Sequence, residues 1–362
     1  MSELNEMQSR PSDSLSSIGD YFWRKKTILY YVMAVLVFIL HCSALSNYAA
    51  QSDTVAAVDN FISFRLCQVA VPMFFTLSGM LFFRNYRPED YLVKLKRRFK
   101  TLAIPYLSWN VITVLFAAVT TAFLSQYFAG RKPFEWSASS VLLGVVHHKY
   151  NLPFWFIFNL IYYVICTPVV DLLTREKYAS PFLITGMLLL NIPELLVPRP
   201  VFSTPNTLIY YLIGAYIGRH WIGVFSKKES KTISLLGLAL IVIAIASECA
   251  CVAGKYGVYK EIMKVLNRIV YVLGVWWFAD LIVDRIKVRP FMHHSFMVFA
   301  MHVDIGAIVS KLVYMALPKS SAFAYISFLL TVALTLLFIE GTCMFLKKYC
   351  CRLYQILTGS RA

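Results

Sequence analysis

His41 is an ionisable side chain that the sequence places deep inside an apolar run. The stretch VLVFILHCSALSNY continues an apolar segment that begins near Thr27. On a helix, His41 would lie about 21 Å beyond Thr27, past the middle of a bilayer. Its imidazole could act as a general base or proton relay, because His titrates near neutral pH. A neutral His that bonds a hydroxyl or a carbonyl is the structural alternative.

Further ionisable side chains fall within apolar segments later in the chain, where an unpaired charge is costly. They are Glu248, His302, Asp304 and Glu340. Two interpretations stay open, because partners in a helical bundle are far apart in sequence. These groups form either a proton path or a set of internally paired structural residues.

A cluster of cations precedes the third apolar segment, in the stretch KLKRRFKTLAIPY. An anionic nucleotide diphosphate could bind to this run of Lys94, Lys96, Arg97, Arg98 and Lys100, because Arg binds phosphate in a bidentate manner. The alternative is an ordinary excess of positive charge at the cytoplasmic end of a membrane helix.

Four side chains are candidate hydrogen-bond donors to a reacting oxygen: Arg65, Ser78, Trp155 and Asn159. For three of them, an ordinary structural role is the alternative. Arg65 could reach the membrane surface, Trp155 could belong to an interfacial aromatic belt, and Ser78 beside Gly79 could serve helix packing. Asn159 is the stronger functional candidate, because an amide inside an apolar span needs a partner.

Composition identifies the elements that must position these residues. The chain has 362 residues, of which 59% are hydrophobic and 15% charged, and its mean hydropathy is +0.63. Soluble proteins carry about 25% charged residues, and apolar runs here are long enough to cross a bilayer. We therefore expect an all-α, polytopic membrane helical bundle with about ten transmembrane helices. The expected spans are 27–46, 66–83, 101–124, 153–173, 180–197, 205–222, 232–252, 263–283, 295–316 and 322–346.

The loops indicate orientation. Most of the 35 Lys and Arg residues lie on the side of the N-terminus, which predicts that both termini are cytoplasmic. This distribution in short loops argues against nucleic-acid binding despite the net charge of +16. We expect a disordered tail over 1–26, a membrane domain over 27–346 and a basic cytoplasmic tail over 347–362. The outer loop 125–151 carries a short apolar segment that predicts an interfacial or re-entrant helix.

Six stretches in order resemble the acyltransferase family 3, a family of integral-membrane O-acyltransferases. They cover nearly the whole chain: ILHCS, VPMFFTLSGMLF, KRRFKTLAIPYLSW, PFWFIFNLIYYVICTPVV, YYLIGAYIGR and HSFMVFAMHV. The resemblance implies transfer of an acyl group, usually acetyl from acetyl-CoA, to a hydroxyl of a surface polysaccharide or lipid-linked sugar. It also implies a multi-pass protein of the bacterial inner membrane.

The resemblance assigns roles to individual positions. The family's proposed catalytic His falls on His41 and its later His on His302. Its Ser-Gly falls on Ser78 and Gly79, its tryptophan on Trp155, and its basic pair for acyl-CoA on Arg97 and Arg98. Tyr30 stands where many members have an Arg, and Lys100 replaces the second Arg of a further motif.

We expect His41 to be the general base, with the oxyanion donor among Ser78, Asn159, Trp155 and Arg65. Direct attack on the thioester and an acyl-His intermediate both fit. No metal is expected. A secondary transporter or flippase for a glycan or small molecule stays open, as does a membrane scaffold.

Overall fold

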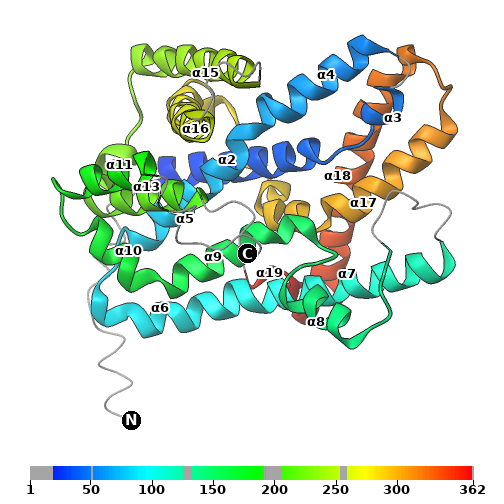
Figure 1. Cartoon of the computed structure of the whole chain (residues 1–362), viewed down its shortest axis with the longest axis horizontal. Helices are drawn as coiled ribbons and strands as arrows, with labels where there is room; N and C mark the ends of the chain where they lie inside the picture. The colour runs from blue at the N-terminus through cyan, green and yellow to red at the C-terminus, as the bar shows by residue number, and fades with distance from the viewer. Residues whose placement is uncertain are drawn as a thin grey trace.

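The computed structural model describes residues 19–49, 52–124, 133–190, 192, 206–252 and 259–360, and all regular elements in these ranges are helices (Figure 1). The α-helices are α2 Asp20–Leu40, α3 Ser46–Ala49, α4 Asp53–Phe64, α5 Ala70–Phe83, α6 Tyr91–Arg98, α7 Ile104–Phe123, α8 Ala138–Val146, α9 Trp155–Ile165, α10 Thr167–Thr174, α11 Ser180–Leu189, α13 Thr207–His220, α14 Ile222–Phe225, α15 Lys231–Val252, α16 Lys260–Phe278, α17 Ser295–Ala316, α18 Ala324–Tyr349 and α19 Cys351–Thr358.

Each of the ten expected spans contains one of these helices, or the pair α9 and α10. Six helical stretches within the described ranges are long and apolar enough to cross a membrane, and a seventh results if α9 and α10, bent by 71°, form one span. The sequence led us to expect about ten membrane crossings, which is more than the six or seven that these helices provide. Helices α11 and α13 have only 10 and 14 residues, and the first two turns of α2 carry three cations, Arg24, Lys25 and Lys26.

The tightest helix contact joins α5 to α13, and it is made by glycines. A Cβ on Gly214 would lie 2.0 Å from the carbonyl oxygen of Thr76, and a Cβ on Gly218 would lie 2.2 Å from that of Met80. Gly79 lies equally close to the backbone of α13. Small residues let helix backbones approach in this way within membranes. The rotation of α5 about its own axis is thereby fixed.

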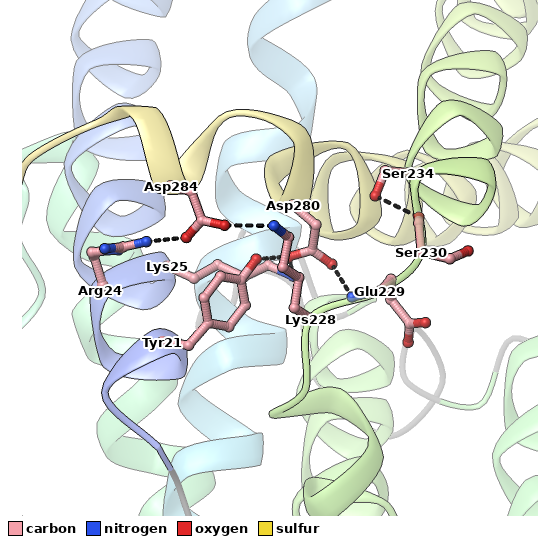
Figure 2. A network of polar contacts seen from close by, with 9 residues as sticks. All are labelled: Tyr21, Arg24, Lys25, Lys228, Glu229, Ser230, Ser234, Asp280 and Asp284. Carbon is pink, nitrogen blue, oxygen red and sulfur yellow. Dashed lines mark hydrogen bonds and ion pairs between the residues drawn. The ribbon is translucent and has the colours of Figure 1, made fainter.

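The start of α2 is held by acidic residues that follow α16 (Figure 2). Lys25 forms an ion pair with Asp280 at 2.6 Å, and both side chains are buried. Asp280 also accepts hydrogen bonds from the hydroxyl of Tyr21 and from the backbone N–H of Glu229. A buried carboxylate with three partners is well compensated.

A second, exposed cluster lies beside the buried one. Asp284 pairs with Arg24 and Lys228, and the hydrogen bond from Lys228 lowers the pKa of Asp284. Surface ion pairs contribute little to stability because water screens them. The two clusters therefore make a matched comparison of buried and exposed charge.

We predict that Lys25→Met lowers the stability of the protein by about 3–5 kcal/mol, because Asp280 would keep a buried charge without its lysine. Thermal unfolding of the purified protein measures the effect. Lys228→Met is the control, and it should leave the melting temperature nearly unchanged. Equal melting temperatures for the Lys25 variant and the unmodified protein would contradict the prediction.

We also predict that Gly214→Ala costs at least about 1–3 kcal/mol, because its Cβ meets the backbone of α5 and forces the helices apart. The control is Gly186→Ala in α11, where a Cβ meets nothing within 4 Å. That change should be neutral or slightly stabilising, since Ala favours helix over Gly. Similar melting temperatures for the two variants would refute the close-packing account.

Candidate functional site

A cavity of about 770 Å³ lies between α2, α5, α6, α9 and the start of α17. One part of its wall is basic, with six cationic or titratable side chains: Lys26, Arg84, Lys94, Arg97, Arg98 and His293. Another part is aromatic, with Phe74, Phe156 and Phe299. Among the described residues that line it, none is acidic. The cavity therefore suits a ligand that is anionic at one end and uncharged at the other.

The basic wall holds several positive charges close together. Arg97 and Arg98 make no ion pair with any residue in the part of the chain that the structure describes. The guanidinium of Arg98 lies 5.5 Å from the ring of Phe82. Burial and then the positive charge of Arg98 lower the pKa of Arg84. Like charges held this close favour an external anion.

Helix periodicity and a wide turn explain this wall. Lys94, Arg97, Arg98 and Thr101 follow a spacing of three or four residues, so they share one face. The helix passes through a π-helical turn at Phe99–Ala103 before it continues as α7. Such turns occur frequently at functional sites.

Pro105 and Gly359 explain the backbone at this turn. Pro105 has no N–H with which to bond the carbonyl of Thr101 four residues earlier. Gly359, which follows α19, lies against that carbonyl with a φ of +65°, and a Cβ on it would be 2.5 Å from the oxygen. The end of the expected C-terminal tail thus packs on α7 and contributes Gly359 and Ser360 to the cavity wall.

The aromatic end contains Ser78. Gly79 faces α13, so the neighbouring Ser78 is turned toward the cavity, which it lines. Phe74 and Phe156 lie 5.6 Å apart between ring centroids, and Phe156 and Phe299 lie 5.7 Å apart. The Ser78 hydroxyl is thus available as a hydrogen-bond donor beside an apolar surface.

The structure brings His41 and His302 together, with ring centroids 5.4 Å apart. His41 ends α2 and is exposed, whereas His302 in α17 is 1% exposed. The Nδ1 of His302 donates a hydrogen bond of 2.6 Å to the carbonyl of Phe299, because a carbonyl oxygen only accepts. Neutral His302 therefore keeps a lone pair on Nε2, which is buried without a hydrogen-bond partner among the described residues.

The predicted site residues thus fall into separate groups. Ser78, Arg97 and Arg98 line the cavity. His41 and His302 form a pair that does not line it. Phe299, which does line the cavity, lies next to this pair, with its ring centroid 6.0 Å from that of His302.

The remaining predicted site residues lie elsewhere. Asn159 is buried and donates to the hydroxyl of Thr207 at 3.4 Å. Trp155 packs on Phe75, and Arg65 donates to the carbonyl of the preceding residue. Lys100 is exposed and does not line the cavity, because its position is turned away from the basic face.

Two of the ionisable side chains in apolar segments are internally paired. Glu340 accepts a bond of 2.6 Å from Nδ1 of His294, and Glu248 lies 3.5 Å from Arg268. The sequence left open whether these residues form a proton path or pair with one another for structural reasons. For Glu340 and Glu248, the observed pairing is of the structural kind.

Some cavity residues escaped the sequence reasoning. Lys26 lies in α2, Arg84 follows α5 and His293 precedes α17, so they are far apart in sequence. Lys94 was already part of the basic run, and it lies three and four residues before Arg97 and Arg98 on one helix face. Nothing in the sequence indicated that Phe299 both lines the cavity and contacts His302.

The outer loop expected over 125–151 contains α8, and residues 125–132 of it lie outside the described residues. Helix α8 runs back along α7. Before α8, the backbone N–H of Phe134 donates a hydrogen bond to the hydroxyl of Thr121, near the end of α7. At the end of α8, the carbonyl of Val146 accepts a hydrogen bond from the hydroxyl of Tyr106, near the start of α7. At the turn that follows, His148 has a φ of 46°, and burial and then the charge of His147 lower the pKa of His148 to about 4.

Comparison with known proteins places this geometry in context. A family model described as an acyltransferase domain, of the acyltransferase 3 type, matches residues 31–340. The chain is similar to the succinoglycan biosynthesis protein ExoH of Rhizobium meliloti (strain 1021), with 23% identity over 229 residues. That alignment covers 62% of this chain and 60% of the relative, so the chain spans less than two thirds of the relative's length. No solved structure matches.

Proposed function

Because this chain belongs to the acyltransferase 3 family of membrane acyltransferases, we propose that it moves an acyl group, most simply acetyl from acetyl-CoA, to a sugar hydroxyl. The observation that carries this proposal is the cavity with a basic wall, an aromatic end and no acidic lining among the described residues. Acetyl-CoA has the matching chemistry, with phosphates at one end and a thioester at the other.

The phosphates of acetyl-CoA would bind at the basic wall. Arg97 and Arg98 supply planar guanidinium groups that suit phosphate, and Lys94 and Arg84 add charge beside them. The uncharged pantetheine arm would extend toward Ser78 and the aromatic end. Ser78 is then the best-placed donor to the developing thioester oxyanion, since Trp155, Asn159 and Arg65 do not line the cavity.

His41 would act as the base in the transfer step. Its imidazole takes the proton of the acceptor hydroxyl while the oxygen attacks the thioester carbonyl carbon. The carbon–sulfur bond then breaks, and the coenzyme A thiolate takes up a proton. An acyl-His41 intermediate that the sugar resolves is the second route. His302 lies beside His41 as a neutral imidazole with its tautomer fixed by the Phe299 carbonyl.

The acceptor in this proposal is a surface polysaccharide or a lipid-linked glycan. The printed name of the similar R. meliloti protein, which concerns succinoglycan biosynthesis, supports this class. His41 is exposed away from the basic cavity, so donor and acceptor would approach from different sides. The proposal includes about ten membrane crossings, cytoplasmic termini and the bacterial inner membrane as location.

We predict that His41→Ala lowers kcat for thiol release from acetyl-CoA by about 10²–10⁴-fold, the usual contribution of a general base. Mass spectrometry of surface glycans with and without the protein identifies the acceptor by one added acetyl group. His147→Ala, which removes an exposed histidine of the outer loop, is the control and should retain activity. A folded His41→Ala protein with full turnover would exclude the proposed role of His41.

We predict that Arg98→Gln raises KM for acetyl-CoA by about tenfold to a hundredfold, since a hydrogen bond to a charged group contributes about 1.5–3 kcal/mol. The control is Lys96→Gln, which removes one charge from the same helix at an exposed position off the cavity. Its KM should change much less. Equal effects of both changes would show a general field of the helix instead of phosphate contact.

A further inference from the structure

Phe299 belongs to two environments at once. Its side chain lines the aromatic end of the cavity and is 6% exposed. Its ring lies 6.0 Å from that of His302, and its own carbonyl accepts the Nδ1 hydrogen of that histidine. The donor cavity and the histidine pair therefore meet at this one residue.

The ring of Phe299 is part of a cluster of aromatic rings. It stacks on Phe154 at 5.4 Å and meets Phe156 at 5.7 Å and Phe296 at 6.2 Å between centroids. Neither His41 nor His302 lines the cavity, and His302 is 1% exposed. A thioester bound in the cavity would therefore have the Phe299 ring between it and the imidazole of His302.

The proposed reaction requires these groups to meet. A general base acts within about 2.6–3.2 Å of the proton that it takes. The attacking oxygen must come within about 3–3.5 Å of the thioester carbon. A phenyl ring between the thioester and the base satisfies neither condition, so the ring has to turn aside at χ1 before transfer.

We infer that Phe299 is a positioning residue that separates the acyl donor from the His41–His302 pair and from water, and that its displacement joins the two for acyl transfer. The inference rests on the proposed function. The unpartnered Nε2 of His302 agrees with it, because a buried acceptor without a partner calls for an explanation. Once the ring moves, that nitrogen becomes accessible to a group entering from the cavity.

The separation has a chemical use. Without it, the histidines could activate water, whose oxygen would add to the thioester carbonyl carbon. The carbon–sulfur bond would break, and acetate and protonated coenzyme A would result. The Phe299 ring suppresses this hydrolysis until an acceptor is present, as closure of an active site does in other enzymes.

The chain offers a matched control on the same wall. Phe156 also lines the aromatic end and is 8% exposed, comparable to Phe299. Its ring contacts Phe74, Phe75 and Phe299, and no ring contact joins it to either histidine among the described residues. A change at Phe156 therefore alters the cavity without opening it toward the pair.

The experiment compares Phe299→Ala and Phe299→Leu with Phe156→Leu and the unmodified protein. Thiol release from acetyl-CoA in proteoliposomes without acceptor measures hydrolysis. Labelled acetyl in the glycan and lipid fraction of membranes that contain the protein measures transfer. We expect Phe299→Ala to raise the ratio of hydrolysis to transfer by about tenfold, and Phe299→Leu to raise it less. Phe156→Leu should lower both rates in proportion.

The added hydrolysis should also depend on the histidine, so His41→Ala combined with Phe299→Ala should return it to background. An unchanged ratio in both folded Phe299 variants would overturn the inference, and the milder Leu variant covers the case in which Ala does not fold. Absence of thiol release and of acetyl transfer in the unmodified protein would instead reject the proposed function.

Discussion

Contact between the backbones of α5 and α13 fixes the geometry on which the site depends. Glycines on both helices bring the chains so close that α5 cannot rotate without a clash. The side of α5 opposite α13 therefore faces inward, and it carries Phe74 and Ser78 to the cavity. Sequence alone left packing and chemistry as alternatives for Ser78 beside Gly79. The helix geometry allows both, since adjacent residues point about 100° apart.

The distribution of acidic groups gives the cavity its character. Asp280 is occupied by Lys25, and Asp171 is held between Arg175 and Arg219. These carboxylates serve to join helices, and none of them lines the cavity. Arg97 and Arg98 of the basic wall consequently make no ion pair with a carboxylate among the described residues. A protein with the same composition but one carboxylate moved to this wall would lose that preference for anions.

The sequence predicted the places of the helices well, because apolar length and flanking charge are local properties. It also placed Arg97 and Arg98 at a basic face, since helix periodicity is local too. It could not show that His302 lies beside His41, that Glu340 pairs with His294, or that Phe299 of the cavity wall contacts His302. Those facts depend on the packing of distant helices, which periodicity does not encode. The exposed position of Lys100 was readable from spacing, but the resemblance to a family motif pointed elsewhere.

The π-helical turn at Phe99–Ala103 means that the two halves of one long helix are set independently. Before it, Arg97 and Arg98 face the cavity, and after it Trp109 and Asn110 bond α19 and the end of α8. A relative that lacked a single residue here would have its halves rotated by about 100° against one another. Such a chain would keep every sequence motif of the family, yet its arginines would point away from the cavity.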